Sequence, residues 1–595
     1  MVRTMTAPEG AVDGAVPGGL EDPTELEPEQ GSLDLAAPGD DWTVQDWEKA
    51  TAGVLRKARR LGEDDPDSLV WDKLTRRTLD GIDVTPLGMP SSLEGLATAG
   101  RPARAGDWDV RALVEPGQEK TQNESALVDL DGGVTSLWVQ ADASTDLGAL
   151  LQGVLLDLAP VVLDAPSAPV AVAESFLAHL GDTAAAPGTN LGARSTASAD
   201  DLVAVARLAL ERGMLGVVVD GTAVHDRGAS DATELGWLLA SGARVLRVLE
   251  EAGVAPADAA GLVELRVAVT DEQFPSIAKL RAVRRLWARV LELSGVADGE
   301  ARVHAVTSRP MMTRYDPWVN MLRTTVAAFA AGVGGADSVT VLPFDAPLGR
   351  PDAFGRRIAR NTSHLLIDES HVAHVADPAG GSYAVEQLTD HLAAAGWEAL
   401  GRLDSTDGPD EQALADLVAA TVEAREKQVA TRKHPVTGVS EFPNLAEALP
   451  EREAYDGWEG VSPWAASFEA MRDDAPATPV FLATLGTVAQ HTARATFASN
   501  LLAAGGVAVV PAGATDGPDA VVAAYTALET PTPVVCLAGA DPTYDEWGEA
   551  AAAALREAGA TRVLIAGRPT DYSDDSCAMG VDALAFLTRT REALQ

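Results

Sequence analysis

The sequence predicts a parallel α/β protein: a (β/α)8 barrel of the TIM type followed by a smaller flavodoxin-like domain. Strands and helices alternate over about 250 residues, a span that suits a closed barrel. After a linker that contains Pro476 and Pro479, a βα series of about 115 residues has the size and order of a flavodoxin-like unit. The 595 residues are 46% hydrophobic and 23% charged, which is globular and too long for one ordinary core.

Charge and cysteine content limit the partners and the compartment. Lys and Arg number 46 against 88 Asp and Glu, which gives a formal net charge of -42. Such a field repels phosphate backbones and anionic lipid, so we expect no nucleic-acid partner and no membrane partner. The two cysteines, Cys536 and Cys577, are too few for a framework of disulfides, which favours a reducing compartment. Residues 1–41 also lack a secretory signal, so we predict a cytoplasmic protein. Gly505, Gly506 and Pro511 interrupt the longest uncharged stretch, 495–515, which predicts a helix, a turn and a buried strand.

The N-terminal residues 1–41 are predicted to be an acidic flexible arm. Arg3 is their one basic residue, and scattered prolines leave too little apolar surface for a core. Composition alone leaves two interpretations open, a solvated tail or an arm that orders on a partner. A helix follows, indicated by the helical spacing of Trp42, Trp47, Val54 and Leu55 and ended by Leu61-Gly62.

We assign residues 42–395 to the barrel domain with its N-terminal extension. Its buried strands are predicted from five apolar runs: Ser136–Val139, Val161–Leu163, Leu215–Val219, Leu265–Val269 and Val339–Leu342. The amphipathic stretches between them predict helices at Ala199–Glu211, Asp231–Glu250, Ser276–Leu293 and Trp318–Ala331.

Residues 396–477 are predicted to form a mostly helical, charged linker region, and residues 478–595 the flavodoxin-like domain. The strands predicted in that domain are Val480–Ala483, Val507–Val510, Val534–Leu537 and Arg562–Ile565. The helices are Ala489–Ala504, Asp519–Leu528 and Asp545–Ala558, and a short βα unit ends the chain.

Motifs that commonly mark a metal or phosphate site are few. No Walker-type or dinucleotide-binding glycine loop and no C-x-x-C or H-E-x-x-H motif is present. His371, His374 and Asp377 could share one side of a helix and hold a metal, although such two-histidine clusters are more often incidental. Asp129 and Asp131 before two glycines resemble a calcium loop only in fragment, and a plain turn is favoured. We therefore predict no metal site.

Two further positions could serve a site in a parallel fold. His225 and Asp226 follow the predicted strand Leu215–Val219, and the active-site face of a barrel lies at the carboxyl ends of its strands. They could act as a general acid/base pair, or they could be an ordinary solvated loop pair. Ala566-Gly567 would let a ligand approach the backbone closely, although a tight helix-entry turn explains it equally well.

Four long strings resemble one enzyme family. Phe274–Arg289 (FPSIAKLRAVRRLWAR) and Asp377–Glu386 (DPAGGSYAVE) resemble the methylmalonyl-CoA mutases. Asp316–Thr325 and Thr437–Pro443 are most similar to the small, or beta, subunit branch of the bacterial heterodimeric enzymes. The likeness runs from about residue 42 to the C-terminus and includes the order of the two predicted folds.

The resemblance implies an isomerase that interconverts succinyl-CoA and methylmalonyl-CoA with adenosylcobalamin, inside a barrel that encloses the acyl-CoA. It also gives the positions of the catalytic residues. The family's Tyr–His pair aligns on Thr222 and Ala223. A second His of the family is retained as His304, but the Gln two residues after it is replaced by Val306. A methyl group cannot hydrogen-bond a thioester carbonyl, so these positions are degenerate and no catalytic residue is expected here.

The cobalamin positions implied by the resemblance are also broken. The family's Asp-x-His-x-x-Gly motif places His491 at the cobalt-ligand position, but Ala489 and Arg494 replace its Asp and Gly. A second register places Gln490 there instead. Ala489 cannot accept the hydrogen bond that fixes the other nitrogen of an imidazole ligand, so we expect no cobalamin on this chain. The remnant positions are Glu369, His491, Leu537 and Gly567.

The sequence thus predicts a non-catalytic subunit of the small type, with a degenerate cobalamin-binding domain at 478–595. Its expected partner is a large (alpha) subunit that binds both adenosylcobalamin and the acyl-CoA substrate. Two alternatives remain open. One is an independently active cobalamin-dependent acyl-CoA mutase with a rearranged site, and the other is a sensor that binds cobalamin or another small molecule.

Overall fold

The computed structural model describes Gly39 and residues 41–96, 101, 102, 104, 106–297, 299–530 and 532–595. The chain divides into two compact units, one up to Thr75 and one from Arg76 to Gln595. The arm predicted for residues 1–41 lies outside the described residues, apart from Gly39 and Asp41.

The first unit contains α2 (Val44–Lys57), the 3-10 turn η1 (Asp67–Leu69) and α3 (Val70–Leu74). Thr43 and Asp46 form a reciprocal capping box that starts α2. The sequence predicted that this helix extends to Leu61, and that end is wrong. Arg59 adopts a positive φ of 55°, which a right-handed helix does not accommodate, so the helix stops at Lys57.

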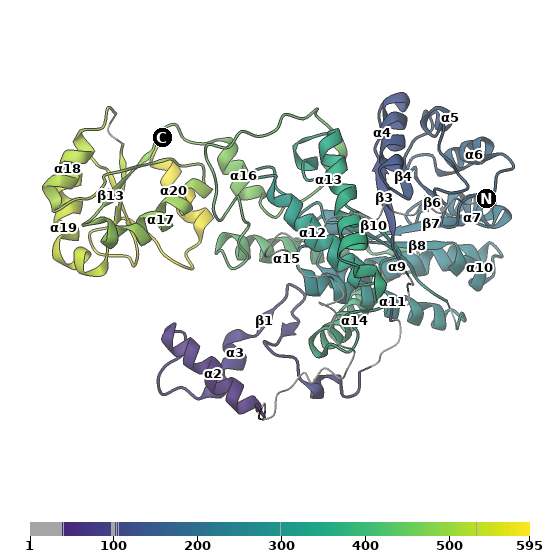
Figure 1. The fold of residues 1–595 in the computed structure, drawn as a ribbon, viewed down its shortest axis with the longest axis horizontal. Helices are drawn as coiled ribbons and strands as arrows, with labels where there is room; N and C mark the ends of the chain where they lie inside the picture. Colours follow the sequence, from purple (N-terminus) through teal and green to yellow (C-terminus); the bar gives the residue numbers. More distant parts are fainter. Residues whose placement is uncertain are drawn as a thin grey trace, which may run out of the picture. The chain divides into compact units, whose positions relative to one another are not determined.

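The second unit begins with the short pair β1 (Arg76–Arg77) and β2 (Asp83–Val84) and the turn η2 (Pro90–Leu93), and then forms a closed barrel of eight parallel strands. The strand at each end of the barrel sequence pairs with the other, which closes the sheet (Figure 1). The barrel strands are β3 (Asp109–Val114), β4 (Ser136–Gln140), β5 (Val161–Asp164), β6 (Asn190–Arg194), β7 (Leu215–Asp220), β8 (Val263–Val269), β9 (Arg302–Thr307) and β10 (Ser338–Thr340).

All five predicted barrel strands are present, although β10 ends at Thr340 and not at Leu342, and the sequence missed β3, β6 and β9. Each missed strand carries polar residues that break the apolar pattern, such as Arg111 in β3 and His304 in β9. In β6, Gly192 has a φ of +73°, and a side chain there would lie 1.8 Å from the carbonyl oxygen of Leu163. The register of β6 shifts at this glycine, so its bulge hid the strand.

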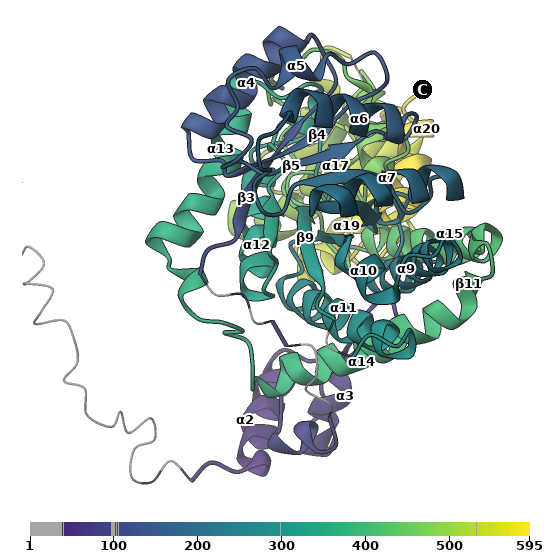
Figure 2. The same ribbon diagram turned by 90° about the vertical axis from the view of Figure 1, so that its right-hand side faces the viewer.

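Helices cover the outside of the barrel strands (Figure 2). Their hydrophobic faces and the outward side of the strands form one continuous core. The helices of this part are α4 (Glu119–Asp131), α5 (Leu147–Leu150), α6 (Pro169–Leu180), α7 (Ala199–Arg212), α8 (Thr222–Asp226), α9 (Asp231–Glu251), α10 (Pro256–Gly261), α11 (Gln273–Leu293), α12 (Val319–Val333), η3 (Ala346–Leu348), α13 (Ala353–His364), the π-helical turn η4 (Leu365–Glu369) and η5 (Val372–His374).

The segment after the barrel is less helical than the sequence predicted. It contains α14 (Tyr383–Leu403), the pair β11 (Asp404–Ser405) and β12 (Gly408–Pro409), α15 (Glu411–Ala430) and α16 (Ala466–Asp473). Between α15 and α16 the one helical element is η6 (Asp456–Trp458), because prolines and glycines interrupt the chain there. Helix α14 also runs without a break across residues 395 and 396.

The C-terminal part is an open sheet of five parallel strands in the order β14-β13-β15-β16-β17. One face packs against α17 and α20 through residues such as Leu501 and Phe586, and the other packs against α18 and α19 through residues such as Tyr525 and Leu555. The predicted βα series is confirmed as β13 (Val480–Thr484), α17 (Val488–Ala504), β14 (Val509–Pro511), α18 (Pro518–Thr526), β15 (Val534–Ala538), α19 (Asp541–Glu557), β16 (Arg562–Ala566), β17 (Asp575–Cys577) and α20 (Ala583–Glu592).

The uncharged stretch 495–515 forms the end of α17, a turn and the strand β14, but the expectation that this strand is buried is wrong, because β14 lies at the edge of the sheet and is partly exposed. Within the described part of the chain, no helix is both long and apolar enough to cross a membrane. Cys536 and Cys577 are free and buried beneath α17 and α20.

Candidate functional site

Large side chains fill the lumen of the barrel. The guanidinium carbon of Arg266, on β8, lies 3.8 Å from the centroid of the Trp138 ring, on β4. Three strands separate β4 from β8 in either direction around the barrel, so this contact passes through the lumen. The Trp138 ring also meets His304 of β9 edge-on, with 5.7 Å between the ring centroids. The lumen is therefore closed at the level of these three residues.

A second contact crosses the lumen nearer the amino ends of the strands. Arg111 of β3 donates to Glu264 of β8 at 2.8 Å, and neither side chain is exposed. Arg111 also donates to Ser136 at 3.0 Å and to Asp109 at 3.1 Å. Each of the three guanidinium nitrogens therefore has a hydrogen-bond partner within the protein, two carboxylates and a hydroxyl.

Nearer the carboxyl ends of the strands, Asp164 of β5 and Asp220 of β7 hold the remaining arginines. Arg194 donates to both oxygens of Asp164, at 2.6 and 2.9 Å, and Arg266 donates to Asp220 at 2.8 Å. Burial alone would raise the pKa of Asp164, but Arg194 and Arg266 more than offset it and lower that pKa. Ion pairs therefore continue through the depth of the barrel.

His304 is part of this network. Arg266 Nε donates to its Nδ1 at 3.1 Å, so the ring's hydrogen is on Nε2, which lies 2.8 Å from the Thr340 hydroxyl. Burial, followed by the charges of Arg111 and Arg266, lowers the pKa of His304 well below its usual value of 6.5. The ring is neutral and points into the filled lumen.

The three positions predicted to be degenerate lie on β9 and on the turn after β7. Thr222 begins α8, and its hydroxyl donates to Asp220 at 2.5 Å. Ala223 is exposed in the same turn, and Val306 is buried in β9. The lumen network was not predicted from the sequence. Its arginines, Arg111 and Arg266, lie singly within mainly apolar strands, and they were not recognised as residues that face the lumen.

His225 and Asp226 do not form a pair, and neither lies in a solvated loop. Both belong to helix α8, where His225 is buried and its Nε2 lies 2.7 Å from the Ser308 hydroxyl. Asp226 accepts a hydrogen bond from Arg309 at 3.0 Å, and burial raises its pKa despite that arginine. Consecutive residues of a helix project in different directions, so the two side chains reach separate partners.

The candidate metal trio does not assemble. His371 has a positive φ of 52° and the segment is a 3-10 turn, with the His371 and His374 rings stacked at 4.5 Å between centroids. Asp377 is instead ion-paired with Arg281. Glu369 is exposed at the end of η4. Across the described residues, no three or more His, Cys, Asp or Glu side chains are arranged to hold a metal ion.

The Asp129–Gly133 fragment is the end of a helix. Asp129 lies in the last turns of α4 and accepts a hydrogen bond from Arg360 at 2.8 Å, and Gly132 caps the helix. Its carboxylate therefore neutralises arginines of α13, and the segment has no calcium-loop geometry.

At the carboxyl edge of the C-terminal sheet, His491 lies in the first turn of α17. Its Nδ1 is 3.2 Å from the carbonyl oxygen of Gly486, and the residue is 7% exposed. We predicted from Ala489 that this nitrogen lacks an acceptor, and that part of the argument is wrong because the preceding turn supplies a backbone carbonyl. Gln490 instead completes the capping box of the helix with Thr487.

Arg494 and Tyr544 lie against Leu537 and Gly567, two of the positions predicted to be cofactor-site remnants. Arg494 donates to the carbonyl of Gly539 at 2.8 Å, and a side chain at Gly567 would meet its guanidinium at 3.5 Å. The Tyr544 hydroxyl lies 3.0 Å from the carbonyl of Leu537 and 2.9 Å from that of Ala566. The sheet order reverses between β13 and β15, and this edge is where such sheets bind ligands. Protein side chains occupy it here.

Fold and site define a barrel protein with an additional parallel-sheet domain and a lumen closed by its own ion pairs. A family model described as methylmalonyl-CoA mutase matches residues 206–519. A methylmalonyl-CoA mutase small subunit of Streptomyces virginiae is 44% identical over 94% of this chain and 98% of that protein. The small subunit of Propionibacterium freudenreichii subsp. shermanii is 34% identical over 95% and 96% of the two chains. A probable small subunit of Mycobacterium bovis is 41% identical over 88% and 92%. The chain belongs to the methylmalonyl-CoA mutase family.

Proposed function

We propose that this chain is the non-catalytic small subunit of an adenosylcobalamin-dependent methylmalonyl-CoA mutase. In this proposal it supports a large subunit that interconverts succinyl-CoA and methylmalonyl-CoA. The observation that carries the proposal is the filled lumen, because a barrel that encloses an acyl-CoA needs an open axis. The Trp138–Arg266 contact and the Arg111–Glu264 pair both cross that axis. Opening it would break buried ion pairs, which is costly.

The residues at the degenerate positions support the same proposal. Ala223 and Val306 carry only alkyl groups, and the Thr222 hydroxyl is bound to Asp220. No group at these positions is free to hydrogen-bond a thioester carbonyl. We therefore assign no catalytic residue to this chain and place the acyl-CoA on its partner.

The C-terminal residues 478–595 fit a flavodoxin-like domain that has lost its cobalamin site. Counted along the chain, the strand order of the sheet is 2-1-3-4-5, which is the flavodoxin-like order. Its ligand-binding edge is occupied by Arg494 and Tyr544, and His491 is buried. These residues do not fit a corrin with a histidine ligand, so we assign adenosylcobalamin to the large subunit only and no metal to this chain.

The partner we propose is a large subunit of the same family, since the relatives that match almost the whole chain are named small subunits. The barrel domain, 42–395, and the linker region, 396–477, would serve structure and assembly. The arm, residues 1–41, is our candidate for ordering on the partner. Deleting it should weaken co-purification with the large subunit, and unchanged affinity would make it a solvated tail.

The test compares turnover of succinyl-CoA by the purified full chain, by the large subunit, and by the two together, each with saturating adenosylcobalamin. We expect no turnover by the chain alone and bound cobalamin only where the large subunit is present. In the complex, Ala223→Asp places a charge at the degenerate histidine position and should leave kcat unchanged. Turnover by a chain free of large subunit would refute the proposal and favour an independently active mutase.

A further inference from the structure

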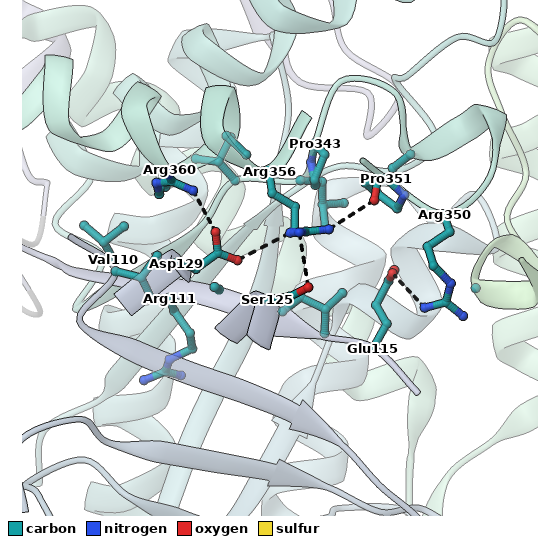
Figure 3. A pocket seen from close by; sticks show the side chains of 18 of the residues that line it. Val110, Arg111, Glu115, Ser125, Asp129, Pro343, Arg350, Pro351, Arg356 and Arg360 are labelled. Carbon is teal, nitrogen blue, oxygen red and sulfur yellow. Dashed lines mark hydrogen bonds and ion pairs between the residues drawn. The ribbon is translucent and has the colours of Figure 1, made fainter. Parts of the chain in front are cut away.

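A cavity of about 110 Å³ lies between helices α4 and α13 and the strands β3 and β10 that they cover (Figure 3). It lies at the seam where the barrel closes, and β3 and β10 pair there over only two residues each. The cavity extends to the loop after β10 at the carboxyl end of the barrel. It is separate from the lumen contacts of Trp138 and from the edge of the C-terminal sheet.

The inner part of the cavity is apolar. Side chains of β3 and β10, of the chain just before β4 and just after β10, and of helix α13 form this part of the wall. They are Val110, Ala112, Val134, Val339, Val341 and Ala359. A cavity of 150 Å³ with such a lining holds a benzene-sized molecule, so this one has room for a chain of a few carbons.

The charged side chains of the remaining wall are mostly cationic. Arg309, Arg350, Arg356 and Arg360 line the cavity, against the carboxylates of Glu115 and Asp129. Arg309 is bound to Asp226, which is not part of the wall. The wall therefore carries more positive than negative charge, although the whole chain has a net charge of -42.

Asp129 forms ion pairs with two arginines of α13. Arg360 donates to one of its oxygens at 2.8 Å, and Arg356 Nε lies 3.6 Å from the other. Arg356 also donates to the Ser125 hydroxyl and to the Pro351 carbonyl, each at 3.2 Å (Figure 3). These contacts hold the Arg356 guanidinium at the cavity wall. Its nearest carboxylate, Asp129, is beyond hydrogen-bond length and is bound by Arg360.

Arg350 is the least satisfied of the four. Its nearest carboxylates, Glu115 and Glu453, are both 3.9 Å away, which exceeds hydrogen-bond length. Its backbone is fixed to Glu453, and its guanidinium lies over the ring of Tyr455. Among the described residues, its buried Nη1 has no hydrogen-bond partner. A fixed guanidinium with an unused donor matches the geometry of a carboxylate or phosphate oxygen.

We propose that this cavity binds a small organic anion, a short-chain carboxylate or phosphate monoester. Its charged head would accept hydrogen bonds from Arg350 and Arg356, and its short alkyl chain would lie over Val110, Val339 and Ala359. The apolar wall excludes a bare inorganic ion as the best ligand. The four guanidinium groups of the described wall outnumber its two carboxylates, which disfavours a cation.

The test measures the Tm of the full chain with butyrate, n-butyl phosphate, inorganic phosphate, 1-butanol and butylammonium. We expect butyrate, butyl phosphate or both to raise Tm in a saturable manner, and the pair tells whether the head is a carboxylate or a phosphate. The other three should have no saturable effect. Equal stabilisation by 1-butanol, or no response to either organic anion, would overturn the proposal.

Variants locate the binding. Arg350→Gln should weaken the affinity at least tenfold, and Arg350→Lys should weaken it less, because the charge stays and the fork is lost. Ala359→Leu fills the apolar end without changing a charge and should also weaken binding. The exposed Arg289→Gln is the matched control and should bind like wild type. Equilibrium dialysis with labelled butyrate gives the same ranking independently of Tm, and wild-type affinity in both Arg350→Gln and Ala359→Leu would refute the site.

Discussion

The barrel lumen and the carboxyl edge of the C-terminal sheet are the two places where parallel α/β folds commonly hold ligands. Arginine side chains fill both, but in different ways. In the lumen, Arg111 and Glu264 are fully buried and join strands that are not neighbours. At the edge, Arg494 is 30% exposed and pairs with Asp541, which is 78% exposed.

The two sites are therefore closed to different depths. The lumen pairs are part of the barrel core, so a ligand path there would require several simultaneous substitutions. The sheet edge is covered by one arginine at the surface and one tyrosine, so it is closed less deeply than the lumen. Breaking a buried ion pair typically costs several kcal/mol, whereas an exposed pair contributes little. Substitutions in the two regions should therefore separate clearly.

The largest effect is expected from Glu264→Gln. It removes a fully buried charge and leaves Arg111 with one carboxylate, Asp109, in place of two, so the free energy of unfolding of the barrel should fall by about 3–5 kcal/mol. The matched control is Glu292→Gln, which breaks the exposed pair with Arg289 and should cost less than about 1 kcal/mol. Urea unfolding followed by tryptophan fluorescence measures both. Equal small changes would mean that the lumen network does not stabilise the barrel.

The same network explains which strands the sequence could predict. The five predicted strands consist mainly of apolar residues, and their apolar runs were sufficient. The strands β3 and β9 present Arg111 and His304 to the lumen, so they look like polar segments until the barrel is closed around them. A charge that is buried by residues far away in sequence leaves no local pattern.

The candidate sites show the same limit. His225 was expected beside Asp226, yet the fold pairs it with Ser308, which is distant in sequence. His491 lies in the predicted helix Ala489–Ala504, whereas His304 lies in β9, a strand that the sequence missed. The family strings did not predict the backbone carbonyl that Gly486 offers to His491, because a turn's carbonyl direction depends on dihedral angles. Nor did any motif indicate the arginine-lined cavity, whose wall comes from several separate segments.

A smaller effect is expected from the pH dependence of stability. The pKa of His304 is lowered in the folded protein, mainly by burial, while an unfolded histidine titrates near 6.5. Below about pH 6.5 the unfolded state binds the extra proton, so stability falls by up to about 1.4 kcal/mol per pH unit until the folded pKa is reached. His304→Gln should remove this part of the slope between pH 7.5 and 5.5. His434 contributes to the remaining slope, because burial lowers its pKa too.

Unfolding curves of wild type and His304→Gln at each pH measure this difference. The variant should be less stable at pH 7.5, where it loses the bonds to Arg266 and Thr340. Its disadvantage should shrink as the pH falls. Parallel curves for the two proteins would show that His304 does not resist protonation in the folded state.

At the sheet edge, Arg494→Ala should change the free energy of unfolding by less than about 1 kcal/mol. Asp541 is largely in solvent and Arg494 is partly exposed, so screening and side-chain entropy offset most of the attraction between them. Asp541→Asn is the matched partner variant and should have a similar small effect. A loss as large as that of Glu264→Gln would contradict the idea that this closure is shallow.

The smallest expected effect is no change at all when hydroxocobalamin is added to the purified chain. His491 has one feature of a cobalt ligand, because the Gly486 carbonyl can hold Nδ1–H and leave Nε2 with a lone pair. Its burial and the guanidinium of Arg494 over Gly567 oppose that role. Wild type and His491→Ala should therefore give the same absorption spectrum with the cobalamin. The Arg494→Gly variant restores the glycine of the family's motif but leaves Ala489 at the position of the motif's Asp. We therefore expect the same spectrum from this variant too. A histidine-ligated spectrum that appears in wild type and disappears in His491→Ala would show that the edge is an open cobalamin site.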